Sequence, residues 1–157
     1  GSYTGLRIGI AAAKGFCFAM DIPLIALNTL EIMVQPHIVS SDTFIIPMLD
    51  ARRMEVYTAV FDSNKKWVAK TSALVLSEIS FMDVVQSHPC LIIGDGAAKF
   101  KRLHPKIKAR FTEEVHYPSA KEMFLLALKC FEKKEFESLA YFEPFYLKDF
   151  QTTPSKK

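Results

Sequence analysis

Apolar and small residues fill the first twenty positions of the chain almost without interruption. Ser2 or Thr4 can cap a helix here, and the helix ends near Met20, shortly before Pro23. A helix that is apolar on nearly every side is either surrounded by its own protein or part of an interface. Two interpretations therefore stay open: a central helix packed on its own sheet, or a helix that offers one face to a partner chain.

Glycine recurs in this helix, although inside a helix it costs roughly 1 kcal/mol relative to alanine. Gly5, Gly9 and Ala13 are spaced by four residues, so they share one stripe along which another backbone can approach closely. The pattern predicts an interface with a partner chain. Its predicted members are Tyr3, Thr4, Gly5, Leu6, Arg7, Gly9, Ile10, Ala13, Lys14 and Cys17.

Short apolar runs separated by turn residues follow from residue 24 onward. They predict strands at residues 24–27, 43–50, 55–61, 67–76 and 90–93, and a weaker strand at 115–117. Pro47 favours an edge position or a bulge for the second of these strands. Helices are predicted at residues 29–35, 77–86 and 120–133, and directly after Gly96. This order of elements is typical of an α/β fold with a hairpin-rich sheet.

Composition adds only broad limits. The chain has 157 residues, of which 50% are hydrophobic and 24% charged, as in ordinary globular proteins. Its formal net charge of +3 is compatible with an RNA-linked role but does not argue for one. Three cysteines, far apart in apolar runs, indicate reduced thiols and predict a cytoplasmic protein. No apolar run reaches the roughly 18 residues of a membrane span.

Residues 50–57 read DARRMEVY and place two acids and two arginines around a predicted hairpin turn. In one interpretation Asp50 accepts hydrogen bonds from turn amides while Arg52 and Arg53 are solvated. In the other, Asp50 and Glu55 are a pair of catalytic carboxylates. The spacing alone favours the charged turn.

Gly94, Asp95 and Gly96 stand between a predicted strand and a predicted helix, where backbone amides can hold a phosphate. The third glycine of the dinucleotide fingerprint is absent. A structural turn is the favoured interpretation, and a weak nucleotide site is the alternative. The four histidines, at positions 37, 88, 104 and 116, lack the spacing of a helical metal site.

Three motifs occur together and in order: GSYTGLRIGIAAAKG at residues 1–15, DARRMEVY at 50–57 and PFYLKDF at 144–150. In this combination the chain resembles the bacterial TsaB family, also called YeaZ. Members look like G-P-G-S-[FY]-T-G-[LV]-R-[IV]-G followed by A-x-G, D-A-R-x-x-E-V-Y, G-x-G and P-x-Y-L-R. Tyr57 belongs to the hairpin signature, whereas Met54 and Lys148 depart from the family pattern.

The resemblance implies an actin-like ATPase (ASKHA, RNase H-like) fold, truncated at the N-terminus because family members carry further strands before this point. It also implies a division of the chain. Residues 1–35 are expected to be the remainder of the N-terminal subdomain with the interface helix. Residues 36–150 are expected to form the C-terminal subdomain, and residues 151–157 a flexible tail.

The resemblance further implies a non-catalytic scaffold in the complex that forms threonylcarbamoyladenosine next to the anticodon of tRNA. Such a scaffold stabilises and positions the catalytic subunit TsaD. The expected partners are homologues of TsaD and of the nucleoside triphosphatase TsaE, or a second copy bound through the N-terminal helix, with tRNA engaged only indirectly. Neither a membrane nor DNA is an expected partner.

ATP and metal are implied for the partner subunits, and no cofactor is expected in this chain. The H-x-x-x-H metal motif that the resemblance implies for TsaD has no counterpart among these histidines. The alternative function is that of an actin-like-fold enzyme, either a small-molecule kinase or a glycoprotease-like peptidase, that uses Asp50 and Glu55.

Overall fold

The chain folds as two compact units in the computed structural model, which describes residues 3–115 and 117–147. One unit is Leu27–Lys129, and the other joins Gly1–Ala26 to Cys130–Lys157. The expected cap at Ser2 and the expected tail at residues 151–157 lie outside the described residues. The boundary predicted at residue 35 concerns the family's subdomains and stays a prediction. The elements are α1 (Tyr3–Met20), α2 (Thr29–Val34), β1 (Phe44–Asp50), β2 (Glu55–Phe61), β3 (Trp67–Val75), α3 (Met82–Ser87), β4 (Cys90–Ile93), α4 (Ala97–Leu103), β5 (Arg110–Phe111), a 3-10 turn η1 (Ala120–Met123) and α5 (Phe124–Glu132).

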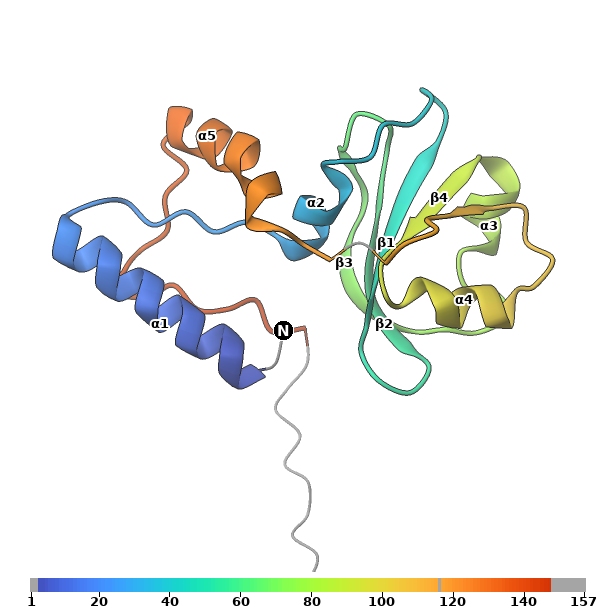
Figure 1. The fold of residues 1–157 in the computed structure, drawn as a ribbon, viewed down its shortest axis with the longest axis horizontal. Coiled ribbons are helices and arrows are strands. Elements are labelled where there is room, and N and C mark those ends of the chain that lie inside the picture. The colour runs from blue at the N-terminus through green and yellow to red at the C-terminus, as the bar shows by residue number, and fades with distance from the viewer. Residues whose placement is uncertain (1–2, 116, 148–157) are drawn as a thin grey trace, which may run out of the picture. The chain divides into compact units, whose positions relative to one another are not determined.

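A five-stranded sheet of order β3-β2-β1-β4-β5 forms the centre of the larger unit (Figure 1). The β1–β2 and β2–β3 pairs are antiparallel, whereas β1–β4 and β4–β5 are parallel. This mixed α/β sheet confirms the predicted fold class. Because β1 and β4 are parallel neighbours, the hairpin turn that follows β1 and the turn at residues 94–96 that follows β4 lie at the same edge of the sheet.

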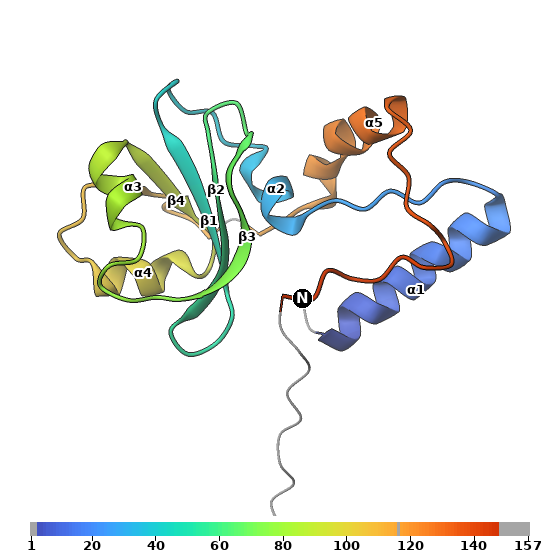
Figure 2. The same cartoon turned by 180° about the vertical axis from the view of Figure 1, so that it is seen from behind.

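Alternating side chains of the strands enter separate cores on the two faces of the sheet, because successive side chains in a strand point in opposite directions. Ile46 and Met48 of β1 pack with Phe100 of α4 in one core. Ile45, from the same strand, packs with Met33 of α2 in the other. The result is three layers, with α2 on one face and α3 and α4 on the other (Figure 2).

Pro47 is an exception to the rule that proline belongs at sheet edges. Its strand β1 lies between β2 and β4, so the predicted edge position is wrong. On the β2 side, the register joins Ile45 to Phe61 and then Met48 to Thr58 and gives Pro47 no partner, whereas on the β4 side Pro47 is paired with Ile93. The ladder therefore accommodates a residue that has no N–H to donate.

Several predicted elements differ in the structure. Residues 24–27 form no strand, since only Leu24 makes an isolated bridge, to Glu137. The helix predicted at residues 77–86 begins only at Met82. The predicted strand at residues 115–117 is not formed at 115 or 117, while 116 lies outside the described residues. The fifth strand is instead the two-residue β5, which pairs with β4 at Leu91↔Arg110.

In the smaller unit, the segment that follows α5 runs along α1 (Figures 1 and 2). The Lys14 ammonium donates to the carbonyls of Ala140 and Phe142 at 3.4 and 3.2 Å. Leu24 pairs with Glu137, whose amide donates to the Leu24 carbonyl at 2.8 Å. One side of α1 is thus covered by the chain itself. Within the described residues, no helix combines the length and apolar character needed to cross a membrane.

The three cysteines are all free thiols, and Cys17 and Cys90 are buried while Cys130 is half-buried. Burial raises the pKa of the Cys90 thiol to about 11, so this group stays protonated at neutral pH.

Candidate functional site

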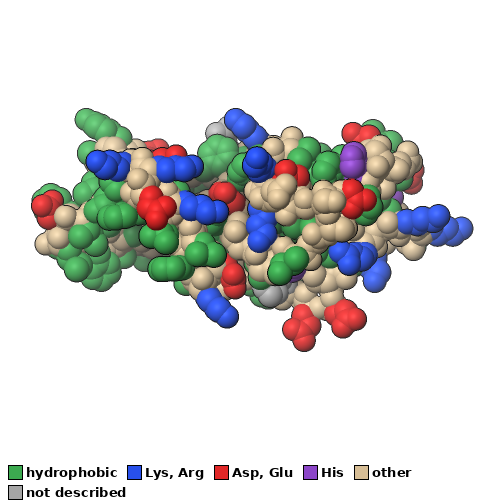
Figure 3. All heavy atoms as spheres, turned by 90° about the horizontal axis from the view of Figure 1, so that it is seen from above, with side chains coloured by type: hydrophobic (Ala, Val, Ile, Leu, Met, Phe, Trp, Pro, Cys, Tyr) green, Lys and Arg blue, Asp and Glu red, His purple; other side chains and the backbone are tan. Residues whose placement is uncertain are grey.

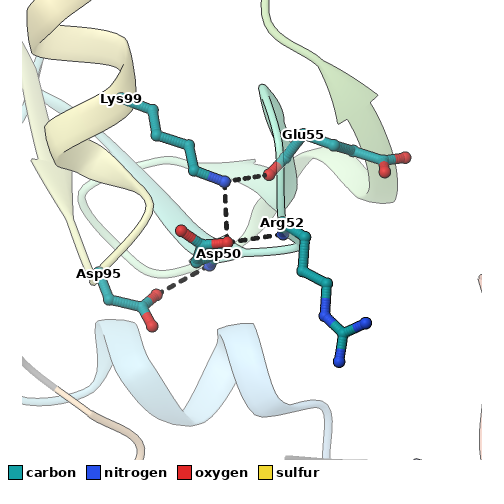
Figure 4. Close-up of polar contacts among 5 residues, drawn as sticks. All are labelled: Asp50, Arg52, Glu55, Asp95 and Lys99. Atoms are coloured by element: carbon teal, nitrogen blue, oxygen red, sulfur yellow. Dashed lines mark hydrogen bonds and ion pairs between the residues drawn. The ribbon is translucent and has the colours of Figure 1, made fainter.

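The predicted hairpin at residues 50–57 is present, and one carboxylate organises it. Asp50 ends β1, and its Oδ1 accepts a hydrogen bond from the Arg52 amide at 2.6 Å. The same oxygen accepts from the buried Lys99 ammonium at 2.8 Å, and Lys99 also donates to the Glu55 carbonyl at 3.1 Å (Figure 4). Asp50 therefore closes the turn and ties it to α4.

The turn at residues 94–96 is joined to the same hairpin. The Asp95 carboxylate accepts a hydrogen bond from the Asp50 amide at 2.8 Å, and the Gly96 amide donates to the Met48 carbonyl at 2.9 Å. Gly94 has a φ of +95°, and a Cβ there would lie 2.4 Å from the Met48 carbonyl oxygen. The glycines allow this close approach to β1. Because the Gly96 amide donates to Met48, it is not available to a phosphate. The geometry supports the structural turn and gives no support to the nucleotide alternative.

Two arginines at the tip of the hairpin have strained backbones. Arg52 and Arg53 have φ values of +68° and +45°, and such a conformation costs a non-glycine residue roughly 1–2 kcal/mol. Both side chains are exposed, as the charged-turn interpretation predicts. Figure 4 shows the Arg52 side chain extending away from the Asp50–Lys99 pair. The hydrogen bond from the Arg52 amide to Asp50 helps to hold this turn in shape.

The two candidate catalytic carboxylates do not face one another. Figure 4 shows the Glu55 side chain directed away from Asp50, on the opposite side of the hairpin from Lys99. Asp50 itself is occupied by Lys99 and the Arg52 amide. Tyr57, the last residue of the signature, is half-buried in β2. The arrangement holds a turn in shape and does not resemble an acid–base pair.

Acid should remove the contribution of Asp50 to stability. The Lys99 hydrogen bond, followed by that from the Arg52 amide, lowers the pKa of Asp50 below its ordinary value of 3.8. The stabilisation is therefore complete above pH 4 and is lost as the pH falls through the lower, folded-state pKa. We expect the stability difference between wild type and Asp50→Asn to be constant from pH 5 to 7 and to shrink below pH 4. Urea unfolding at several pH values measures this, and a pH-independent difference would contradict it.

The helix α1 has a covered side and an open side. Ile10, Ala13 and Lys14 are half-buried and Cys17 is buried, so residues spaced by three and four face the chain's own segment. On the open side, Ile8, Phe16 and Met20 are 65, 68 and 64% exposed. A Cβ at Gly9 would meet no atom within 4 Å.

The predicted interface residues consequently divide between the two sides. Thr4, Gly5, Leu6, Arg7 and Gly9 are exposed. Ile10, Ala13, Lys14 and Cys17 belong to the covered side, where Lys14 and Cys17 make hydrogen bonds within the chain. These four were assigned to the partner face because an all-apolar helix does not reveal from its sequence which side turns inward. The side chain of Tyr3 lies outside the described residues.

Lys99 is a structural residue that the sequence analysis missed. It is 7% exposed, although lysine is rarely buried without a partner. The available signal was its position three residues after Gly96, on the same short helix as the apolar Phe100 and Leu103. Among the described residues, no group of three or more His, Cys, Asp or Glu side chains is arranged to hold a metal ion.

Comparisons with known proteins agree on one family. A family model described as "TsaD: tRNA N6-adenosine threonylcarbamoyltransferase" matches residues 1–155. The "tRNA threonylcarbamoyladenosine biosynthesis protein TsaB" of Escherichia coli K12 is 30% identical over 155 residues, which are 95% of this chain and 67% of that protein. The protein of the same name from Bacillus subtilis 168 is 32% identical over 108 residues, covering 66% of this chain and 46% of that protein. This chain thus spans two thirds or less of the length of these relatives.

Two solved structures share the fold. One is described as an uncharacterized protein with similarity to peptidase YEAZ from Pseudomonas aeruginosa. It superposes with a TM-score of 0.79 at 21% identity, over 94% of this chain and 69% of that one. The second, YeaZ from Pseudomonas aeruginosa, has a TM-score of 0.73 at 21% identity and covers 94% and 70% of the two chains. The predicted actin-like fold class is confirmed.

Proposed function

Because this chain belongs to the TsaB family, we propose that it takes part in forming threonylcarbamoyladenosine in tRNA. Its proposed role is that of a non-catalytic scaffold, which stabilises and positions a TsaD homologue. In this proposal ATP and metal are bound by the partner subunits, among them a TsaE homologue that docks at the shared interface. A second copy of the chain is the competing occupant of the same interface.

The observation that carries the scaffold role is the open side of α1. Ile8, Phe16 and Met20 lie on it at helical spacing, next to the uncovered Gly9. Full burial of one such large side chain contributes about 1.5–3 kcal/mol, so covering all three favours association by several kcal/mol before the costs of binding. An exposed apolar surface of this kind typically marks an interaction site.

The hairpin at Asp50 supports the non-catalytic part of the proposal. Asp50 is bound to Lys99 and to the Arg52 amide, and the Glu55 carboxylate points elsewhere (Figure 4). No specific observation favours the kinase or peptidase alternative, which would need these two carboxylates to act on one substrate.

Gly9→Leu should weaken binding of the TsaD homologue at least tenfold. The new side chain would stand between α1 and a partner that approaches its exposed Gly9 closely, while leucine is a better helix former than glycine, so α1 itself persists. Binding is measured by titrating the immobilised TsaD homologue with each variant. Light scattering across dilution shows whether a second copy occupies the same face.

Ala11→Leu is the matched control, because it adds similar bulk about 200° further around the helix. Ala11 is also exposed. We expect this variant to bind the TsaD homologue within about threefold of wild type. Full-strength binding by Gly9→Leu, or equal losses in both variants, would show that the part of the open side around Gly9 is not the interface.

A further inference from the structure

Positive charge is concentrated in one short part of this weakly basic chain. Residues 96–112 contain six Lys and Arg residues and no Asp or Glu. Since the formal net charge is only +3, the rest of the chain has three more acidic than basic side chains. A localised basic segment of this kind is typical of a surface that binds an anionic partner. The same net charge spread evenly over the chain would not indicate such a surface.

The structure leaves all but one of these cations facing solvent. Lys99 is buried and paired with Asp50, as described above. The other five are exposed, and the ion pairs among the described residues include none of them; they are Lys101, Arg102, Lys106, Lys108 and Arg110. On the face drawn in Figure 3, Lys and Arg side chains extend from the right-hand end, where Figure 1 places α4 and the segment after it.

The surface has shape as well as charge. Ala98, Lys101, Arg102 and Pro105 line an open hollow beside α4. The Lys101 ammonium lies 5.3 Å from the centre of the Phe111 ring, a cation–π contact that directs the side chain along the surface. A hollow lined by two cations suits an anionic group of modest size.

The hairpin tip adds two further cations to this region. Asp50 joins the hairpin to α4 through Lys99, and Arg102 lies near enough to Asp50 to contribute to lowering its pKa. Arg52 and Arg53 come two and three residues after Asp50, have positive φ values and are exposed. Strain that persists in a folded chain is a recurring feature of binding sites.

The chemistry of the surface favours a nucleic acid over a lipid or protein partner. The large apolar residues of the segment are turned inward, since Phe100 is buried and Leu103 and Ile107 are half-buried. A membrane-binding surface needs apolar side chains that insert into the bilayer, and the centre of a protein interface is depleted in charge. Repeated phosphates need only a row of accessible cations.

We propose that residues 101–110, together with Arg52 and Arg53, bind the phosphate backbone of RNA. The identification of that RNA as tRNA rests on the proposed function. The assignment of this surface to RNA binding does not depend on that function. The contact is direct, unlike the indirect engagement of tRNA that the family resemblance implies. Because the contacts are to phosphates, this surface orients the RNA and leaves the reading of sequence to other groups.

The test is binding of an unmodified tRNA transcript to the full-length protein, alone and mixed with its TsaD homologue, followed by fluorescence anisotropy at several salt concentrations. The test variant carries K106Q, K108Q and R110Q. Loss of three phosphate contacts should weaken binding at least tenfold near 0.1 M salt. It should also reduce the slope of log affinity against log salt by about 2.

A control variant with K66Q, K70Q and K121Q removes the same charge at three other exposed positions. It should bind tRNA as wild type does. Unchanged binding by the test variant, or an equal loss in the control, would overturn the proposal. So would tighter binding to vesicles of phosphatidylcholine and phosphatidylserine in equal parts than to tRNA. If the triple variant does not fold, the three single substitutions give the same comparison.

Binding of the TsaD homologue is measured in parallel and separates this proposal from the proposed function. The test variant should capture that homologue at wild-type strength, because its substitutions lie outside α1. Loss of RNA binding with capture intact supports the RNA surface. Failure of wild type to capture the homologue, with RNA binding still dependent on residues 106–110, would refute the scaffold role and leave this surface standing.

Discussion

Gly94→Ala should lower the free energy of unfolding by about 3 kcal/mol or more. A non-glycine residue at the φ of +95° found here costs roughly 1–2 kcal/mol. The added methyl group would also lie 2.4 Å from the Met48 carbonyl oxygen and 2.8 Å from the Met33 methyl carbon. The Met33 side chain can move, but the backbone of β1 is held by strands on both sides, and overpacking adds about 1–3 kcal/mol.

Thermal unfolding followed by circular dichroism measures this effect, which corresponds to a decrease in Tm of roughly 10 °C for a domain of this size. Gly9→Ala is the matched control, because a Cβ at Gly9 meets nothing within 4 Å. In a helix that substitution should raise stability by about 0.5–1 kcal/mol. If Gly94→Ala unfolds at the wild-type temperature, the close approach of this turn to β1 is wrong.

Asp50→Ala should destabilise the protein by about 2 kcal/mol, and clearly more than Lys99→Met. Removing Asp50 leaves the buried Lys99 ammonium without a carboxylate and the Arg52 amide without its acceptor. Stranding one charge of a fully buried pair costs 3–5 kcal/mol, and the smaller value here reflects solvent screening, because the Asp50 side chain is 40% exposed. Lys99→Met leaves Asp50 in contact with water and fills the same volume, so it should cost no more than about 1 kcal/mol.

The double variant of Asp50→Ala and Lys99→Met shows whether the two residues stabilise the protein through their interaction or through two independent contributions. Once Lys99 is gone, removal of Asp50 strands no charge. The double variant should therefore unfold close to Lys99→Met in urea titrations, with a coupling energy of about 1 kcal/mol or more. Equal costs for the two single variants, or strict additivity, would mean that Asp50 does not hold α4 to the hairpin.

The strands of this fold could be read from the sequence because their signal is local. Apolar and β-branched runs bounded by turn residues predicted β1, β2, β3 and β4 close to their observed limits. Residues 24–27 carry the same signal, but the strand predicted there is wrong. Only Leu24 is paired, through an isolated bridge to Glu137, more than a hundred positions away. An apolar run shows that a segment can adopt an extended conformation. A strand forms only where a second strand is available to pair with it.

The candidate sites divide in the same way. DARRMEVY and the glycines at 94 and 96 predicted two turns, and the Gly94 φ of +95° explains one of those glycines. The link between the turns, through Asp50, Asp95 and Lys99, was not predictable, because no local pattern relates residues 45 or 49 positions apart. The sequence shows that residues 99–110 are rich in lysine and arginine. It does not show which of these side chains face solvent.

The sequence by itself determined the family, through three motifs in a specific order, and the α/β class, through the period of its apolar residues. Tertiary structure alone decided which side of α1 is open, why Pro47 can occupy a central strand, and that Lys99 is buried. The physical reason is the same in each case. Periodicity and turn chemistry depend on neighbours in the chain, whereas exposure, ladder position and charge pairing depend on groups that meet only when distant segments pack.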